Sequence, residues 1–356
     1  MEFQKIKLHR SEKNRAAVTQ ITLDDDYNVP DYRQDIVKVI KERGELRFDE
    51  VKAMEGAAWI KGSLVFKVLY RSDKQEGKIS CLRGEIPFQE RLNMDGLSEY
   101  DAVHATGDME DLTIGVINSR KLNVRAVIVL TASSEKEVDE ELTCELSVGS
   151  YYEQNIVEKE ALKLLVVRRD ICRQKSEAVL PSSKPNIREI LWQSMQLRNV
   201  ESRLVEGKIR LSGEILVSIL YNDEEEGEHL SWYETTVPLD AQAECGVMED
   251  DCIWQVQMVP LTMELEVKPD YDGEERILVM ELALDTHIRI WKEEKIRLLT
   301  DLYSLQKEVK PVFRECPLER LLVKNAAKCR MTEQMELKED KEKVLQICSC
   351  EGKVLL

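Results

Sequence analysis

The most regular hydrophobic pattern of the chain runs from Ala58 to Tyr70, with the sequence AWIKGSLVFKVLY. Every even position in this stretch is apolar or glycine, and lysine or serine occupies half of the odd positions. Alternation with a period of two predicts a long β-strand with one buried face. The same alternation returns from Lys208 to Tyr221, 151 residues further along. This strand is therefore the centre of a unit that the chain uses at least twice.

The repeat extends well beyond the central strand at the same offset. Pairs with an identical residue include Pro30 and Pro181, Gly56 and Gly207, Gly62 and Gly213, Tyr70 and Tyr221, and Pro87 and Pro238. The predicted structural core of the repeat is Gly62, Phe66 and Tyr70 in the first copy and Gly213, Val217 and Tyr221 in the second. A glycine inside a strand marks a close approach of a neighbouring backbone or side chain, and we expect such an approach at Gly62 and Gly213.

A different spacing precedes the strands of each copy. The apolar residues with this spacing are Ile36, Val39 and Ile40 in the first copy and Ile187, Ile190 and Leu191 in the second. Positions i, i+3 and i+4 share one face of a helix, and the prolines upstream, Pro30 and Pro185, can fix φ near a helix start. We therefore predict a mainly-β protein of tandem repeated β-sandwich-like domains, each with one short helix near its start, at Asp31–Ile40 in the first copy.

The end of the chain matches the start of the repeat a third time. Cys329, Leu337, Val344, Ile347 and Cys348 lie 157 residues after Cys172, Leu180, Ile187, Ile190 and Leu191. Because no equivalent of the central strand follows, we expect a fragment of a longer protein; the alternative is a tail that packs on an earlier unit. The expected division is an N-terminal lead at 1–15, domains at 16–150 and 151–306, a linker at 307–317 and the incomplete start of a third domain at 318–356.

Composition and charge narrow the functional classes. Hydrophobic residues make up 43% of the chain, enough for folded cores, and charged residues make up 33%. The formal net charge of −17 is spread along the chain, which disfavours nucleic acid and anionic membranes as partners. No apolar run approaches the ~18 residues of a membrane span, and Met1–Arg10 lacks the apolar core of a signal peptide. We therefore expect a cytoplasmic protein without membrane insertion.

Nine cysteines raise the possibility of a metal site or a disulfide framework. The four nearest the end are Cys316, Cys329, Cys348 and Cys350. The repeat argues against both, because Cys329 aligns with Ile21 and Cys348 with Ile40, so that cysteine replaces aliphatic residues as a small buried hydrophobe does. No pair has the C-x2-C spacing of common zinc modules, and a reducing cytosol disfavours disulfides. We predict neither metal nor structural disulfide.

No set of residues has a catalytic spacing. The four histidines do not recur between copies and have no acid or nucleophile at a recognisable distance. Phosphate loops of Walker order and acidic loops of EF-hand order are both missing from the sequence. An enzyme built twice in tandem should repeat its catalytic residues, and only packing and turn residues repeat here. We therefore predict no enzyme activity, no cofactor, and no catalytic, cofactor-binding or metal-binding residues.

One polar segment stands out as a candidate interaction corner: Asn118, Ser119, Arg120 and Lys121. It is a positively charged insertion between apolar Ile114–Ile117 and the predicted strand Leu122–Leu130, in an otherwise acidic chain. One interpretation is a binding corner or a contact between units. The simpler interpretation is a turn in which Asn and Ser cap the backbone and the basic side chains are solvated.

A second functional class also fits the pattern. In a tandem β-module array that binds a carbohydrate or small ligand, acidic loops and aromatics such as Trp232, Tyr233 and Trp254 would line a site. A ligand module predicts a pocket at the same place in both copies. A scaffold predicts exposed apolar or edge-strand surface instead.

Several of these motifs together resemble a known domain. They are the proline-led segment, the G-x-L/I-x-F/V-x-V/I-L-Y strands at Gly62–Tyr70 and Gly213–Tyr221, and the sequence INSRKLNVRAVI at Ile117–Ile128. This combination is similar to the SPOCS domain, which occurs in tandem in clostridial spore-coat assembly proteins, and the resemblance covers the chain from about Ala16 onward. The second half of the second copy departs from the INSRKLNVRA pattern.

The resemblance implies a non-enzymatic scaffold of endospore coat assembly that acts through protein–protein contacts. It implies a location in the mother cell, at the forespore surface. It further implies as partners a spore morphogenetic ATPase (SpoIVA-like) and other coat proteins, with self-association as a further expectation. In proteins of this family a C-terminal LysM domain engages the ATPase, and no LysM-like segment occurs in this sequence.

Overall fold

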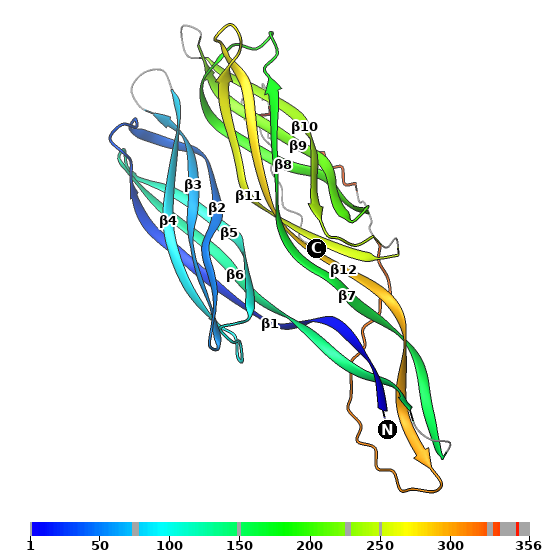
Figure 1. The fold of residues 1–356 in the computed structure, drawn as a ribbon. Coiled ribbons are helices and arrows are strands. Elements are labelled where there is room, and N and C mark those ends of the chain that lie inside the picture. The colour runs from blue at the N-terminus through cyan, green and yellow to red at the C-terminus, as the bar shows by residue number, and fades with distance from the viewer. Residues whose placement is uncertain are drawn as a thin grey trace. The chain divides into compact units, whose positions relative to one another are not determined.

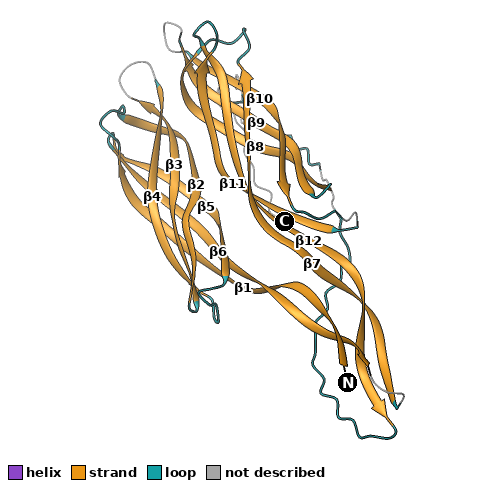
Figure 2. Cartoon of the chain, in the orientation of Figure 1, coloured by secondary structure: helices purple, strands orange, loops and turns teal. Residues whose placement is uncertain are grey.

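The computed structural model describes residues 2–72, 78–147, 151–224, 229–248, 251–325, 330–334 and 347–348, and the side chains of 12–15 lie outside this description. Within these ranges the chain forms strands and loops and no helix (Figure 2). It divides into two compact units, one of Ser11–Val138 with Glu189–Trp192, and one of Met1–Arg10, Asp139–Arg188 and the chain from Gln193 onward. Each unit contains one β-sandwich.

The first sandwich consists of two three-stranded sheets (Figure 1). One sheet has the order β2 (Ile36–Met54), β3 (Ala57–Ser72) and β4 (Ile79–Asn93). The other has the order β1 (Glu2–Asn28), β6 (Lys121–Ser147) and β5 (Ala102–Asn118). The predicted central strand is β3, which pairs antiparallel with both neighbours. Its Phe66 and Tyr70 are fully buried, in agreement with the predicted core.

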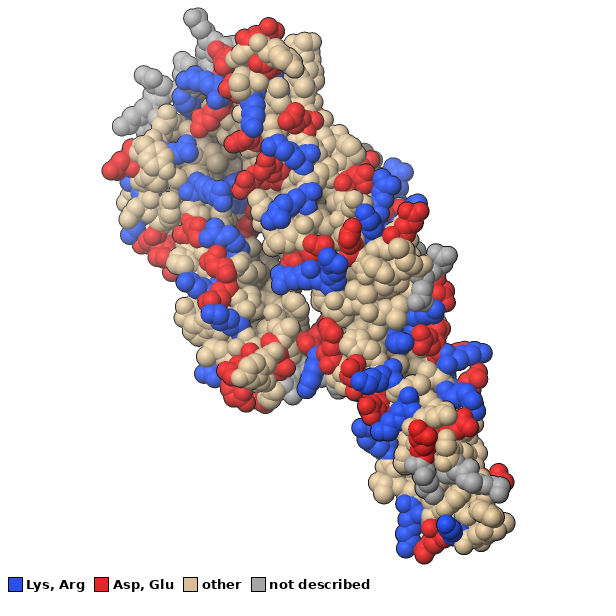
Figure 3. All heavy atoms as spheres, viewed as in Figure 1, with Lys and Arg blue, Asp and Glu red and all other residues tan. Residues whose placement is uncertain are grey.

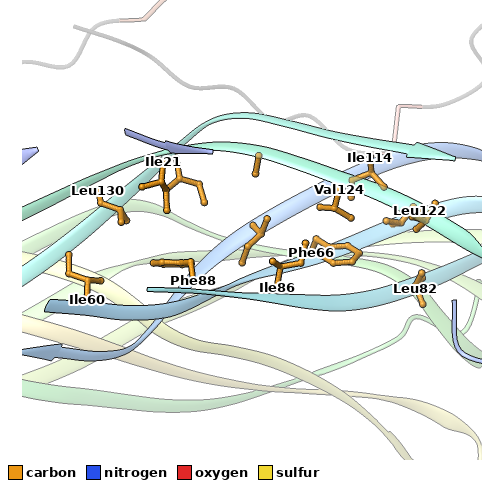
Figure 4. Packing of buried hydrophobic residues seen from close by; sticks show 14 of the residues in the cluster. Ile21, Ile60, Phe66, Leu82, Ile86, Phe88, Ile114, Leu122, Val124 and Leu130 are labelled. Atoms are coloured by element: carbon orange, nitrogen blue, oxygen red, sulfur yellow. The ribbon is translucent and has the colours of Figure 1, made fainter. Parts of the chain in front are cut away.

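The core of this sandwich lies between the inward faces of the two sheets. Figure 4 shows Ile60, Phe66, Ile86 and Phe88 on one side facing Leu122, Val124 and Leu130 on the other. The inward residues of β6 recur at every second position from Leu122 to Ala132, and each has no exposed surface. Fully burying one such aliphatic side chain contributes about 1.5–3 kcal/mol, so the alternation in sequence fixes which face of each sheet is inside.

The second sandwich repeats this plan in the same order. Its sheets are β8 (Ile187–Val205), β9 (Lys208–Asp223) and β10 (Leu230–Glu244), and β7 (Tyr152–Val179), β12 (Glu275–Ser304) and β11 (Ile253–Pro269). The central strand β9 contributes Ile209, Leu211, Ile215 and Val217 to a second core. The prediction of a mainly-β protein with two tandem sandwich-like domains is therefore confirmed.

The predicted short helix is wrong in both copies. Pro30–Asp35 is a turn, and β2 begins at Ile36. β2 is irregular against β3, with register shifts between Ile36 and Lys38 and between Val39 and Lys41. Each bulge inserts one residue and interrupts the alternation, so Ile36 and Val39, three residues apart, pair with Ser72 and Tyr70 on one face of β3. Ile40 falls in the second bulge and is 49% exposed, while Ile36 is buried.

The close approach predicted at the two central glycines is confirmed. A Cβ on Gly62 would clash with the carbonyl oxygen of Arg47 and would lie 2.8 Å from the Phe88 ring. A Cβ on Gly213 would lie 2.9 Å from the carbonyl oxygen of Arg198. In both copies the crowding comes from the neighbouring strand, where β2 shifts register between Phe48 and Glu50 and where Asn199 of β8 has φ 51°.

End segments of four long strands pair as two ribbons, β1 with β6 and β7 with β12. We call these segments the stalk: residues 2–10 of β1, 139–147 of β6, 152–161 of β7 and 293–304 of β12. The antiparallel pairing of β7 with β12 continues through the stalk as far as Tyr152 and Ser304. A small core of Leu8, Leu142, Ala161 and Ile296 holds the segments together. The charge-rich stretch Glu135–Glu141 is part of β6. The predicted N-terminal lead is part of a strand, because β1 begins at Glu2.

Candidate functional site: a clasped loop at one end of each sandwich

The predicted corner at Asn118–Lys121 is the tight turn between β5 and β6, and it grips the loop between β1 and β2. The guanidinium of Arg120 donates hydrogen bonds to the carbonyl oxygens of Arg33 (2.7 Å), Pro30 (2.8 Å) and Val29 (3.1 Å). It also pairs with Asp35 (3.3 Å) and Asp31 (3.5 Å). A planar donor fork satisfies several acceptors at once, so one side chain fixes the course of the whole loop.

Backbone bonds and a tyrosine complete this arrangement. The amides of Val29 and Ile36 donate to the carbonyl oxygens of Arg120 and Ser119, each at 2.9 Å. The hydroxyl of Tyr70 donates to the carbonyl oxygen of Gln34 at 3.2 Å. Burial raises the pKa of Tyr70 above its usual value, so this hydroxyl stays protonated as a donor over a wider range of alkaline pH. We call the loop, its arginine and its tyrosine the clasp.

The other members of the predicted corner have local partners. Asn118 Oδ1 accepts a hydrogen bond from the backbone amide of Arg120 at 2.9 Å, which stabilises the turn. Lys121 pairs with Asp26 at 2.7 Å, and hydrogen bonds from Lys121 and then Asn123 lower the pKa of Asp26. The structure thus places all four residues at one turn and engages Arg120 within its own domain. An interaction role for the corner stays a prediction.

The second sandwich contains the same clasp, built by Arg276. Its guanidinium donates to the carbonyl oxygens of Pro181 (2.6 Å), Lys184 (3.0 Å) and Leu180 (3.4 Å) and to the side chain of Asn186. The amide of Leu180 donates to the carbonyl oxygen of Arg276 at 2.9 Å. The hydroxyl of Tyr221 donates to the carbonyl oxygen of Pro185 at 3.1 Å, and burial raises its pKa. The loop acceptors Leu180, Pro181, Lys184, Pro185 and Asn186 each lie 151 residues after their counterparts in the first clasp.

Sequence reasoning missed Arg276 because the offset changes inside the repeat. Arg276 follows Arg120 by 156 residues, not 151, since the connection before β12 is longer. At the new offset the inward residues of the two strands correspond: Leu122, Val124, Ala126 and Ile128 match Leu278, Met280, Leu282 and Leu284. An alignment that allowed one insertion before residue 276 would have shown the arginine. The second copy therefore lacks the INSRKLNVRA sequence but retains the clasp.

The two clasps differ in exposure and in charge. The Arg120 side chain is 34% exposed and faces two carboxylates, while the Arg276 side chain is 11% exposed and faces an amide, three carbonyls and Glu274 at 3.9 Å. In both copies the guanidinium is engaged by oxygen atoms of its own domain. Chemically, the clasp can hold a loop rigid, and in the first copy that loop carries Tyr32 with 82% of its surface exposed.

The aromatic residues of the alternative ligand site do not gather at one place. Trp232 and Tyr233 are neighbours on β10, so their side chains leave opposite faces of the sheet. The indole of Trp254 donates to Ser202 Oγ at 3.3 Å, and Lys324 lies over its ring at 4.2 Å. The first-copy positions that match Trp232 and Tyr233 are Cys81 and Leu82. The described residues therefore show no aromatic pocket shared by both copies.

The cysteines in the described part of the chain form no disulfide. Cys172, Cys245 and Cys252 are buried in the second core, and burial raises the pKa of the Cys172 thiol. Cys329 and Cys350 lie outside the described residues. Among the residues that are described, no group of three His, Cys, Asp or Glu is arranged to hold a metal ion. A search of the same residues for a helix long and apolar enough to span a membrane finds none.

Comparison with known proteins agrees with this repeat. A family model described as SipL, SPOCS domain, matches the chain twice, over residues 35–117 and 186–268. The two matches start 151 residues apart, which is the offset of the repeat, and each ends shortly before a clasp arginine. The chain is therefore a protein with tandem SPOCS domains.

These domains are of the SipL type, a family related to sporulation. No curated protein and no solved structure matches the chain.

Proposed function

We propose that this chain is a non-enzymatic scaffold of endospore coat assembly, and that its SPOCS domains act through protein–protein contacts. This proposal rests on which residues have the same place and the same contacts in both copies. The shared side chains are the central glycines, the core residues of β3 and β9, and the tyrosine and arginine of each clasp. All of them hold the fold, so each copy is a rigid module whose exposed surface is free to differ.

The surface supports selective contacts. Each sandwich has three-stranded sheets, and every sheet therefore presents two edge strands. Acidic and basic side chains alternate over the face visible in Figure 3, and the edge strands β4 and β10 each carry a proline, Pro87 and Pro238. Charges and prolines on edges discourage unspecific strand pairing. Contacts with partners are then selected by charge pattern and shape.

Location and partners follow from the family resemblance. We place the protein in the mother cell, at the forespore surface, with a SpoIVA-like morphogenetic ATPase and other coat proteins as partners. The SPOCS domains supply the contacts with other coat proteins, and a LysM domain of the kind found in family members supplies the contact with the ATPase.

A capture experiment tests this division of labour. The chain, and the same chain fused to a family LysM domain, are immobilised and exposed to extract from sporulating cells. Mass spectrometry should find coat proteins with both baits and the ATPase with the fused bait. Equal capture by an unrelated β-sandwich protein of similar net charge would refute the scaffold proposal. A glycan array tests the alternative, because saturable binding of one sugar by each SPOCS domain would favour a ligand-binding module.

A further inference from the structure

A short extended segment after β12 is bound along the stalk. This segment, Arg314–Arg320, has the sequence RECPLER, and we call it the strap. It has no strand pairing of its own, yet it contributes to the stalk core, because the side chains of Cys316 and Leu318 pack against it. A pair of two-stranded ribbons has little core of its own. The strap therefore supplies apolar contacts that the stalk otherwise lacks.

Polar contacts fix the strap at both ends. Near its start, Arg314 donates to the carboxylate of Glu140 at 2.8 Å, and the same carboxylate accepts from Arg10 Nε at 3.1 Å. The Glu140 side chain is 12% exposed and the Arg314 side chain is 68% exposed, so the carboxylate is largely covered while the strap arginine remains in contact with water. Near the other end, the backbone amide of Leu162 on β7 donates to the carbonyl oxygen of Glu319 at 2.7 Å. The strap thus behaves as an extended peptide seated on a sheet edge.

The seat is a groove with a recognisable chemistry. The seat, which we call the stalk groove, consists of the apolar stalk core, the Glu140 carboxylate and the Leu162 amide of β7. A hollow of about 410 Å³ lies alongside the strap and is lined by Leu318 and Arg320 of the strap together with Glu158, Lys159, Glu160 and Lys295. Such a groove selects an extended peptide with arginine, a small apolar residue and an aliphatic residue at alternate positions. Arg314, Cys316 and Leu318 have this order.

The strap is joined to β12 by a linker, residues 305–313, that makes few contacts. Leu305 is 87% exposed, Val312 is 97% exposed and Phe313 is 67% exposed. Two polar contacts of this linker are local, from the amide of Gln306 to Ser304 Oγ and between Lys310 and Glu308. None of the groove contacts depends on which chain supplies the strap. Exchange of an identical element between copies is a low-cost route to association when such a hinge connects it.

We propose that the stalk groove is a docking site for the strap of a second copy of this chain, so that strap exchange links SPOCS chains to one another. A short tether gives the chain's own strap an effective concentration of the order of mM. Exchange therefore dominates where chains are concentrated on a surface. This inference stands on the groove contacts and is independent of the proposed role in coat assembly.

Linker length provides the first test. Glu319 sits beside Leu162, which pairs with Glu293, so the return from Ser304 spans eleven residues of β12, or about 36 Å. The fifteen residues from 305 to 319 reach about 50 Å when extended. Deleting residues 306–310 leaves ten, which reach about 34 Å and cannot close comfortably. We expect this variant to form dimers, measured by light scattering after size-exclusion chromatography, while the unshortened chain at the same dilution stays monomeric.

Two defective chains provide the second test. Leu318→Asp removes a strap anchor and leaves the groove intact; Glu140→Ala weakens the groove and leaves the strap intact. Mixed in equal amounts, they should form a one-to-one complex that neither forms alone. A labelled peptide of residues 311–322 should bind the Leu318→Asp chain, and the same peptide with Asp at 318 should bind more than about tenfold more weakly, because one aliphatic anchor is lost. Val312→Asp is the matched control and should change nothing.

The outcomes separate cleanly. Dimers of the shortened chain together with saturable peptide binding support exchange. A monomeric shortened chain, or a peptide that fails to bind a folded Leu318→Asp chain, would overturn the proposal. Folding is checked independently by circular dichroism of the β-signal and by the melting temperature of each variant. A peptide that binds equally well with Asp at 318 would also contradict the proposal, because the groove would then not recognise the aliphatic side chain of the strap.

Discussion

Replacing the clasp arginine of the second domain should destabilise that domain far more than an ordinary surface change does. Arg276→Ala removes a side chain that is 11% exposed and that donates to three backbone carbonyls and one amide oxygen. A hydrogen bond that involves a charged group contributes about 1.5–3 kcal/mol. The four bonds share one guanidinium and are not additive, and water can reach part of the loop after the change. We therefore expect a loss of about 3 kcal/mol.

The first domain offers a graded comparison. The Arg120 side chain is 34% exposed, so after Arg120→Ala water can reach more of the carbonyl oxygens that lose their donor. The substitution should therefore lower the free energy of unfolding by about 1–2 kcal/mol. Arg125→Ala, on the exposed face of the same strand, is the matched control and should cost less than about 0.5 kcal/mol. Arg120→Lys retains the charge but cannot match the fork geometry, and it should fall between Arg120→Ala and the unchanged protein.

Hydrogen exchange measured by mass spectrometry reads each clasp separately. Its reporters are the amides of Val29 and Ile36 in the first domain and of Leu180 in the second, which bond to the clasp turns. A loss of about 3 kcal/mol corresponds to roughly a hundredfold faster exchange at Leu180. If Arg276→Ala left exchange at residues 180–187 no faster than Arg125→Ala does, the clasp would not hold the loop, and the account of its role would be wrong.

Three further predictions concern other parts of the molecule. Gly213→Val places a side chain 2.9 Å from a backbone oxygen and should cost about 2–3 kcal/mol in denaturant unfolding, whereas Gly115→Val, at an open position, should cost little; equal midpoints would contradict the crowding. Burial raises the pKa of Glu140, but hydrogen bonds from Cys316 and Arg10 and the charges of Arg10 and Arg314 lower it overall. Strap binding should therefore be complete above the usual carboxyl pKa of about 4.3 and weaken as pH falls below it, with Glu140→Gln removing most of that dependence in the peptide assay. The cysteines should be reduced and metal-free, and one equivalent of zinc lost on Cys329→Ser would refute this.

Much of the fold could be predicted from the sequence because the signal is local and repeated. The alternation in β3 and β9 shows directly which residues face the core, and the offset of 151 reveals two copies without any structure. The helix was mispredicted for an equally local reason. A bulge in β2 places Ile36 and Val39, three residues apart, on one face, and the exposed Ile40 completes the spacing of a helix face without belonging to that face.

The clasp could be predicted only in part. The turn at Asn118–Lys121 was singled out by its charge, but its partner loop lies about 90 residues earlier in the chain, and no local pattern links them. Arg276 was hidden by the insertion that precedes it. The strap shows the same limit, since the groove it occupies is assembled from four segments that span most of the sequence, and only their pairing brings Glu140 and Leu162 together.

The most direct measurement of the central claim is the location of a fluorescent fusion of this protein in sporulating cells, with and without the SpoIVA-like ATPase. If the protein is a SPOCS scaffold of the spore coat, the complete protein should form a shell around the forespore, and that shell should disperse when the ATPase is removed. Fluorescence spread evenly through the mother cell while the ATPase shell is intact would contradict the account.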